Sequence, residues 1–176
     1  MTLIRLCLFN NNDVHSFRQN HWKFFSFPEI NLQGKNICVL GHGKTSGLPI
    51  SLLMEKARGN LRVCDINTPR ELFEESLRMS DIIISAVGEI NLVQKKHLKK
   101  DCLVLDVGIN LIPNQIKRKI CGDVDFFDCI DQVKYINKVP GGVGKMTVIF
   151  LLRNVIKAWL NQNNINGEHA DFFIVN

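Results

Sequence analysis

The sequence predicts an α/β fold built on a doubly wound parallel sheet. Short apolar runs alternate with longer amphipathic segments between residues 34 and 160. Two of the runs, "DIIISAVG" and "DCLVLDVG", are apolar almost throughout, as is typical of parallel strands that helices cover on both faces. Several runs end in a glycine, where a strand would pass into a turn before the next helix. Together these observations favour one sheet with helices on each face.

The expected elements follow this alternation along the chain. A helix that opens near Ser46 tolerates Pro49 in its first turn, because the first N–H groups of a helix have no partner within it. For the next helix we expect Thr68 as the N-cap, Pro69 as the first helical residue and Glu71 completing a capping box. Strands are expected at 36–41, 61–65, 81–88 and 101–108, and helices at 46–58, 68–79 and 146–160, with a short apolar segment at 134–139 before the last helix.

Changes in composition divide the chain into three parts. Residues 1–33 lack sustained periodicity and are expected to be an irregular extension, whereas residues 34–160 form the expected domain. Residues 161–176 are a polar, asparagine-rich tail. A chain of 176 residues with 45% hydrophobic and 22% charged residues is long enough for one such core. Apolar residues of the last helix recur at three- and four-residue steps, which indicates an amphipathic helix: Val148, Leu151, Leu152, Val155, Ile156 and Trp159.

The net charge of +5 is small, and the basic residues are scattered. That pattern is typical of a solvated surface, so we expect no nucleic-acid partner. No apolar run approaches the roughly 20 residues of a membrane span, so we expect no membrane partner. The six cysteines form no CxxC pair and no metal-ligand spacing, which favours a cytoplasmic location and argues against a metal site. A mitochondrial presequence stays an alternative, because Arg5, Arg18 and Lys23 outnumber Asp13 near the start.

A glycine-rich turn, "VLGHGKTSGLPI", follows the first expected strand. Its Gly-Lys-Thr is like the end of a P-loop, but that loop needs a glycine where this chain has Cys38, inside a strand. A dinucleotide-binding turn fits better, because Gly41 ends the strand, Gly43 follows, and Gly47 opens a helix whose N-terminus attracts a pyrophosphate. The glycine spacing is one residue longer than the standard pattern, so a plain strand-to-helix turn stays an alternative.

Loops after the later strands favour a Rossmann-like NAD(P)-binding domain. Asp65 ends the second strand, where an acid accepts hydrogen bonds from the adenosine ribose and repels the 2′-phosphate of NADP; a turn-forming or capping acid is the alternative. Gly88 and Gly108 end the third and fourth strands. In an open α/β sheet, ligands lie beyond the carboxyl ends of the strands, so these loops and the turn at 140–144 should border one crevice.

Five segments, in their order and spacing, resemble the nucleotide-binding domain of the methylenetetrahydrofolate dehydrogenase/cyclohydrolase family. They are "GKNICVLGHGKTSGLP", "SDIIISAVG", "LVLDVGIN", "GDVDF" and "VPGGVGKMT", and the similarity runs from about residue 32 to about residue 160. The resemblance implies a role in one-carbon metabolism. In that role the domain holds NAD(P) while a hydride passes from 5,10-methylenetetrahydrofolate to the nicotinamide.

The resemblance also implies roles for particular residues. His42 would lie in the cofactor loop as a weak, pH-dependent contact for a phosphate, and Ile109 would lie beside the nicotinamide. The other four histidines (His15, His21, His97 and His169) are expected on the surface or in loops. Cofactor contacts are expected at Gly41, His42, Gly43, Gly47, Asp65, Ile66, Gly88, Gly108 and Ile109, and substrate contacts at Pro140, Gly141, Gly142, Val143 and Gly144.

This sequence departs from the family at several of these positions. His42-Gly43 stands where the family commonly has Arg-Ser, and Asp65-Ile66 where it has His-Ser or His-Arg. Since the positive charge and the hydroxyl that would bind a 2′-phosphate are both missing, we expect NAD rather than NADP. Lys138 and Lys145 replace two prolines and add positive charge near a site for anionic folate.

The family's N-terminal domain carries a lysine–tyrosine pair and a glutamine, whereas residues 1–33 hold no tyrosine. We therefore expect no catalytic residue in this chain and a folate substrate bound only together with a second domain. Because family members pair through this domain, we expect a homodimer or a heterodimer with a full-length relative. A catalytically inactive dinucleotide-binding or dimerisation module is the alternative function.

Overall fold

Residues 30–112 and 119–163 are the described part of the computed structural model. They fall into two units, one of residues 32–144 and one that includes residues 145–163. The whole parallel sheet lies in the first unit. The predicted borders after residues 33 and 160 stay predictions, because most of the extension and of the tail lies outside the described residues.

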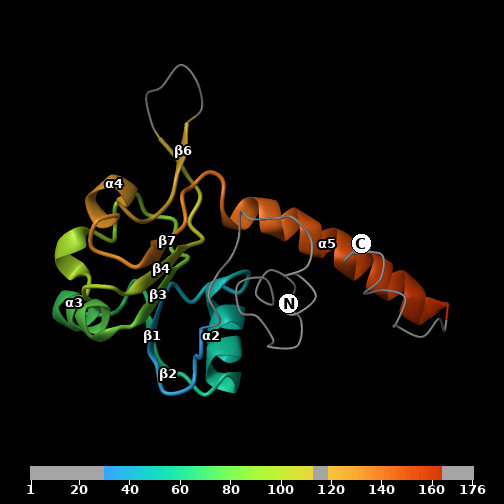
Figure 1. Ribbon diagram of the computed structural model, residues 1–176, viewed down its shortest axis with the longest axis horizontal. Helices are drawn as coiled ribbons and strands as arrows, with labels where there is room; N and C mark the ends of the chain where they lie inside the picture. The colour runs from blue at the N-terminus through green and yellow to red at the C-terminus, as the bar shows by residue number, and fades with distance from the viewer. Residues whose placement is uncertain (1–29, 113–118, 164–176) are drawn as a thin grey trace. The chain divides into compact units, whose positions relative to one another are not determined.

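The sheet has five parallel strands in the order β2-β1-β3-β4-β7 (Figure 1). The chain runs from β1 to β2 on one side and then crosses back to β3 on the other side of β1. This reversal is the point at which doubly wound folds bind ligands. The predicted fold class is therefore confirmed. The strands are β1 (Asn36–Leu40), β2 (Asn60–Cys64), β3 (Ile82–Ser85), β4 (Leu103–Asp106) and β7 (Tyr135–Ile136).

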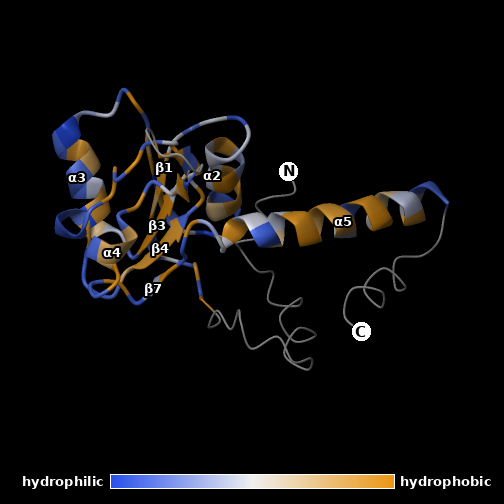
Figure 2. Ribbon diagram, turned by 90° about the horizontal axis from the view of Figure 1, so that it is seen from above, coloured by the Kyte–Doolittle hydropathy of each residue, from blue (hydrophilic) through white to orange (hydrophobic). Residues whose placement is uncertain are grey.

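Helices cover both faces of this sheet. α2 (Gly47–Lys56) lies on one face, and α3 (Arg70–Met79) lies on the other with the short helix α4 (Phe126–Cys129) (Figure 1). Figure 2 shows the apolar strands between these helices. The buried core joins strand and helix residues, among them Leu40, Ile83, Val104, Phe73 and Leu77.

The start of α3 differs from the prediction. The helix begins at Arg70, and its N-cap is Pro69, so the expected capping box does not form. The Thr68 hydroxyl is used elsewhere, because it accepts a hydrogen bond from the N–H of Asp65 (2.9 Å) and donates one to the Asp65 carboxylate (3.3 Å). Thr68 therefore closes the turn after β2 rather than capping the helix.

Four further elements, α4 among them, were not predicted, and the last helix begins earlier than expected. β5 (Asn110–Leu111) and β6 (Ile120–Cys121) form an antiparallel pair, and the 3₁₀ helix η1 (Lys95–His97) precedes β4. The last helix, α5 (Val143–Gln162), starts three residues before its predicted bound. No helix in residues 30–112 or 119–163 is long and apolar enough to cross a bilayer.

His97 was predicted to lie on the surface or in a loop, but its side chain is buried, so the prediction of exposure is wrong. The ring is 1% exposed and stands edge-on to the ring of Phe73, and its Nδ1 accepts a hydrogen bond from the N–H of Gln94 (3.2 Å). Burial lowers the pKa of His97 below its ordinary value of 6.5, although Glu74 opposes this effect. The native state therefore favours the neutral ring.

Replacing His97 with glutamine should flatten the dependence of stability on pH. Because the pKa of His97 is lower in the folded chain, the unfolded chain binds the proton first. The stabilisation is thus complete above about pH 6.5 and is lost as the pH falls from there through the lower pKa of the folded chain, with a slope of at most ~1.4 kcal/mol per pH unit. Urea unfolding between about pH 5 and 8 should show a steeper loss of stability on acidification for the native chain than for His97→Gln. Equal slopes would contradict the assignment.

Candidate functional site

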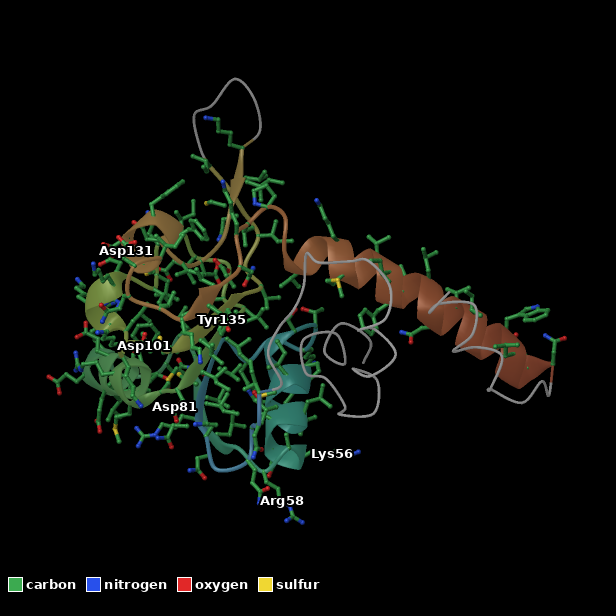
Figure 3. The ribbon with its side chains drawn as sticks, in the orientation of Figure 1. Lys56, Arg58, Asp81, Asp101, Asp131 and Tyr135 are labelled. Atoms are coloured by element: carbon green, nitrogen blue, oxygen red, sulfur yellow. The ribbon has the colours of Figure 1, made fainter. Side chains whose placement is uncertain are left out.

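The carboxyl ends of the five strands bring the predicted site residues to one edge of the sheet. Gly41 follows β1, Asp65 follows β2, Gly88 follows β3, Gly108 follows β4, and residues 140–144 follow β7. Parallel strands all end on the same side, so these loops become neighbours although they are far apart in the sequence. Acidic residues that precede strands lie at the opposite, amino end; Figure 3 labels three of them, Asp81, Asp101 and Asp131.

The turn between β1 and α2 is packed backbone against backbone. Gly41 has a φ of +91°, and a Cβ atom there would lie 2.5 Å from the carbonyl oxygen of Ala86. A Cβ on Gly47 would lie 1.9 Å from the carbonyl oxygen of Gly41. At Gly43, in contrast, a Cβ would meet nothing within 4 Å. Gly41 and Gly47 are thus required by packing, whereas Gly43 borders open space at the exposed turn.

The amino end of α2 can receive an anion. Its N-cap, Ser46, makes no side-chain capping hydrogen bond, and no acidic residue lies in its first turn. The partial positive charge of the helix start is therefore not offset by a local hydroxyl or carboxylate. His42 and Gly43 are both exposed in the turn that leads to this helix. These features fit the pyrophosphate of a dinucleotide.

Asp65 is an exposed acid that also organises its own turn. Its Oδ1 accepts hydrogen bonds from the N–H of Asn67 (2.9 Å) and the hydroxyl of Thr68 (3.3 Å). The first of these bonds is the main reason that the pKa of Asp65 is below its ordinary value, so the group is ionised at neutral pH. The Asn67 side-chain amide also makes a long contact with Oδ2 (3.5 Å), and since a carboxylate offers about four acceptor positions, one stays available to a ribose hydroxyl. Ile66, beside it, is 98% exposed.

Asp123 is fully buried at the same edge and accepts hydrogen bonds from five groups. The Ser85 hydroxyl (2.9 Å) and the Val87 N–H (2.8 Å) bond to Oδ2, and the Glu89 N–H (3.0 Å) bonds to Oδ1. The Gly88 N–H contacts both oxygens. The Asn110 side-chain amide donates to Oδ1 at 2.9 Å. One carboxylate thus joins the loop after β3 to the first residue of β5.

Asp106 is a second buried acid, at the end of β4. It accepts hydrogen bonds from the N–H groups of Gly108 (2.9 Å), Asp123 (3.1 Å) and Val124 (2.9 Å). Burial raises the pKa of Asp106 to about 6, against the effect of these donors. The amide of Asn137, just after β7, both donates to and accepts from the Asp106 backbone, at 2.8 and 2.7 Å. Asp106 therefore links the ends of β4 and β7 to the segment around Asp123.

No role was predicted from the sequence for four residues of this network: Asp106, Asp123, Asn110 and Asn137. Two signals were available: Asp106 interrupts an apolar run at a predicted strand end, and Asp123 lies between the small residue Gly122 and an apolar valine. Neither signal reveals that the two acids meet. The exposed Ile109 (69%) and the turn at 140–144 lie beside this network in the sequence, after β4 and β7.

The chain matches the family model of the tetrahydrofolate dehydrogenase/cyclohydrolase NAD(P)-binding domain over residues 19–163. The bifunctional protein FolD of Dechloromonas aromatica is 39% identical over 136 residues, 77% of this chain and 46% of that protein. The cytoplasmic C-1-tetrahydrofolate synthase of Schizosaccharomyces pombe is 39% identical over 132 residues, 73% of this chain and 14% of that protein. The chain thus spans less than half the length of these relatives.

Two solved structures have the same fold as this chain. The bifunctional enzyme FolD from Campylobacter jejuni matches with a TM-score of 0.71 at 37% identity, over 76% of this chain and 46% of that one. The methylenetetrahydrofolate dehydrogenase-cyclohydrolase of Trypanosoma brucei, complexed with NADP and an inhibitor, matches with a TM-score of 0.69 at 35% identity, over 72% and 44%. The similarity in three dimensions agrees with the family match.

Alanine at Gly47 should destabilise the fold, whereas alanine at Gly43 should not. A Cβ at Gly47 meets a backbone oxygen that no side-chain rotation can move, which should cost about 1–3 kcal/mol. Gly43→Ala, the matched control, should change the free energy of unfolding by less than about 0.5 kcal/mol. Urea unfolding measures both. An equal loss in the two variants would contradict the packing described for this turn.

Proposed function

Since the chain belongs to the tetrahydrofolate dehydrogenase/cyclohydrolase family through its NAD(P)-binding domain, we propose that it binds NAD at the carboxyl edge of its sheet and serves one-carbon metabolism. In the proposed reaction a hydride passes from 5,10-methylenetetrahydrofolate to the bound nicotinamide. The observation that carries the proposal is the tight turn of Gly41 and Gly47 at the uncapped start of α2.

Different residues of this edge are proposed to contact different parts of the dinucleotide. The start of α2 and the exposed Gly43 hold the pyrophosphate, with His42 as a further contact. Asp65 accepts hydrogen bonds from the adenosine ribose, and the exposed Ile66 lies at the same ribose position. When bound, NAD supplies an oxidised nicotinamide ring that accepts a hydride. The chain's own contribution is to orient this ring and to keep water from it.

NAD is proposed over NADP because of Asp65. The carboxylate is ionised, and it would repel a 2′-phosphate on the ribose that it binds. The related T. brucei enzyme was solved with NADP, so the cofactor differs among members of the family if this proposal holds. The choice therefore depends on this position rather than on membership of the family.

A folate substrate is proposed to need a second domain. In this proposal the loops at the carboxyl edge, including residues 140–144, form one wall of the folate site, and the family's lysine–tyrosine pair would form the other wall. We propose that a homodimer, or a heterodimer with a full-length relative, is the working form, and that it acts in the cytoplasm, as the name of the S. pombe relative states for that protein. A catalytically inactive dinucleotide-binding or dimerisation module is the second candidate function.

Asp65→Asn should weaken NAD binding and narrow the preference for NAD over NADP. Asparagine keeps the acceptor for the Asn67 N–H, so the turn survives while the charge is lost. Calorimetry on the native chain should give an NAD dissociation constant of about micromolar or lower and weaker NADP binding. The variant should lose about tenfold in NAD affinity, the value of a charged hydrogen bond. Asp131→Asn removes an exposed charge before β7 and should change neither affinity. Tighter NADP than NAD binding by the native chain would refute the assignment.

The chain alone should form no NADH from methylenetetrahydrofolate. The physical reason is that hydride transfer requires both reactants to be held together, and only the cofactor half is proposed here. The assay follows NADH absorbance with the chain alone and with a full-length relative added. Activity of the chain alone would refute both the need for a second domain and the inactive-module alternative. Stimulation only by the relative would favour the heterodimer.

A further inference from the structure

We propose that Asp123 is a positioning residue that shapes the loops after β3 and β4 to hold the nicotinamide half of the dinucleotide. The inference rests on the proposed function, because it takes a dinucleotide to lie at the carboxyl edge. Asp123 itself is fully buried and touches no ligand in this arrangement. It acts through the backbone groups that it gathers.

The strand order places the nicotinamide half. The pyrophosphate belongs at the start of α2, after β1, and the adenosine ribose belongs at Asp65, after β2. β1 lies between β2 and β3 in the sheet, and β4 follows β3. Because the adenosine half lies on the β2 side of β1, the rest of the dinucleotide extends over the ends of β3 and β4. Those two strand ends carry the loops at 86–89 and 107–110.

Asp123 fixes the first of these loops by filling an anion nest. The N–H groups of three successive residues, Val87, Gly88 and Glu89, all point to its carboxylate. Such a set of backbone N–H groups binds a phosphate in many proteins. Here the protein's own acid takes that place, so the loop does not serve as a phosphate site. A ligand would therefore contact the side of this loop that faces away from Asp123.

The same carboxylate controls the second loop. The Asn110 side chain donates to Asp123, next to the exposed Ile109. Gly108 must be a glycine, because a Cβ there would lie 2.1 Å from an oxygen of Asp123. The position of Asp123 is set in turn by Asp106, which accepts from its N–H. Both loops are therefore held to one buried point.

This arrangement depends on the negative charge. None of the salt bridges in the described part of the chain involves Asp123. Neutral hydrogen-bond donors alone offset the cost of burying the charge. In Asp123→Asn, an amide N–H would face the backbone donors, so part of the loop at 86–89 would lose its acceptor. The variant should therefore loosen the nicotinamide side and leave the adenosine side intact.

Two probes separate the halves of the site. ADP-ribose lacks nicotinamide, and its affinity is measured by calorimetry; the fluorescence anisotropy of bound NADH measures how firmly the nicotinamide ring is held. For Asp123→Asn, we expect ADP-ribose affinity within about twofold of the native value. NADH affinity should fall about tenfold, and the anisotropy of bound NADH should fall with it. Asp131→Asn is the matched control and should change none of these quantities.

A second, milder variant tests the same proposal in case Asp123→Asn does not fold. Asn110→Ala removes one donor and leaves the carboxylate its other four, and it should give the same selective loss in smaller degree. An equal loss of ADP-ribose and NADH affinity, or unchanged NADH anisotropy in a folded variant, would overturn the positioning role. So would a native chain that binds ADP-ribose but leaves the nicotinamide mobile. If the native chain binds neither probe, the proposed function itself fails.

Discussion

The buried carboxylate of Asp123 is the interaction on which the carboxyl edge of this sheet depends. This carboxylate is shielded from solvent and forms no salt bridge in the described part of the chain. Such a group is stable only when hydrogen bonds surround it. Asp123 meets this demand with a hydroxyl, a side-chain amide and three backbone N–H groups. The Ser85 hydroxyl and the Asn110 amide are both buried, and each would cost about 1–3 kcal/mol without a partner. The acid and its loops therefore keep one another in place.

The glycine turn after β1 packs against the first residue of the same loop. Gly41 packs against the carbonyl of Ala86, at the beginning of the loop that Asp123 holds. Gly47 packs against the carbonyl of Gly41, which fixes where α2 begins. A chain of backbone contacts thus runs from the buried acid to the helix start proposed for the pyrophosphate. These contacts are made by the backbone of Gly41 and Gly47 and not by the hydrogen bonds of Asp123, so the start of α2 keeps its own packing.

In the proposed function, the two ends of the dinucleotide are recognised by different kinds of interaction. At the adenosine end, Asp65 is exposed and ionised, so discrimination there is electrostatic and depends on a single side chain. At the nicotinamide end, the controlling acids are buried and act on loop shape. A single substitution at Asp65 should therefore be enough to change the cofactor preference. The geometry for hydride transfer, in contrast, depends on several loops at once.

The sequence by itself determined the elements whose signal is local. The apolar runs and the Pro49-containing helix start located four of the five strands and α2, and the glycine spacing located the turn of Gly41 and Gly47. Only the tertiary structure decided the rest. β7 is two residues long and exists through pairing with β4, the Thr68 hydroxyl is taken by Asp65, and His97 is buried under α3 by Phe73. Asp123 lies 34 to 38 residues from the loop and strand end that it holds. No helical or strand period encodes contacts at that separation, because they arise only when the sheet has brought the strand ends together.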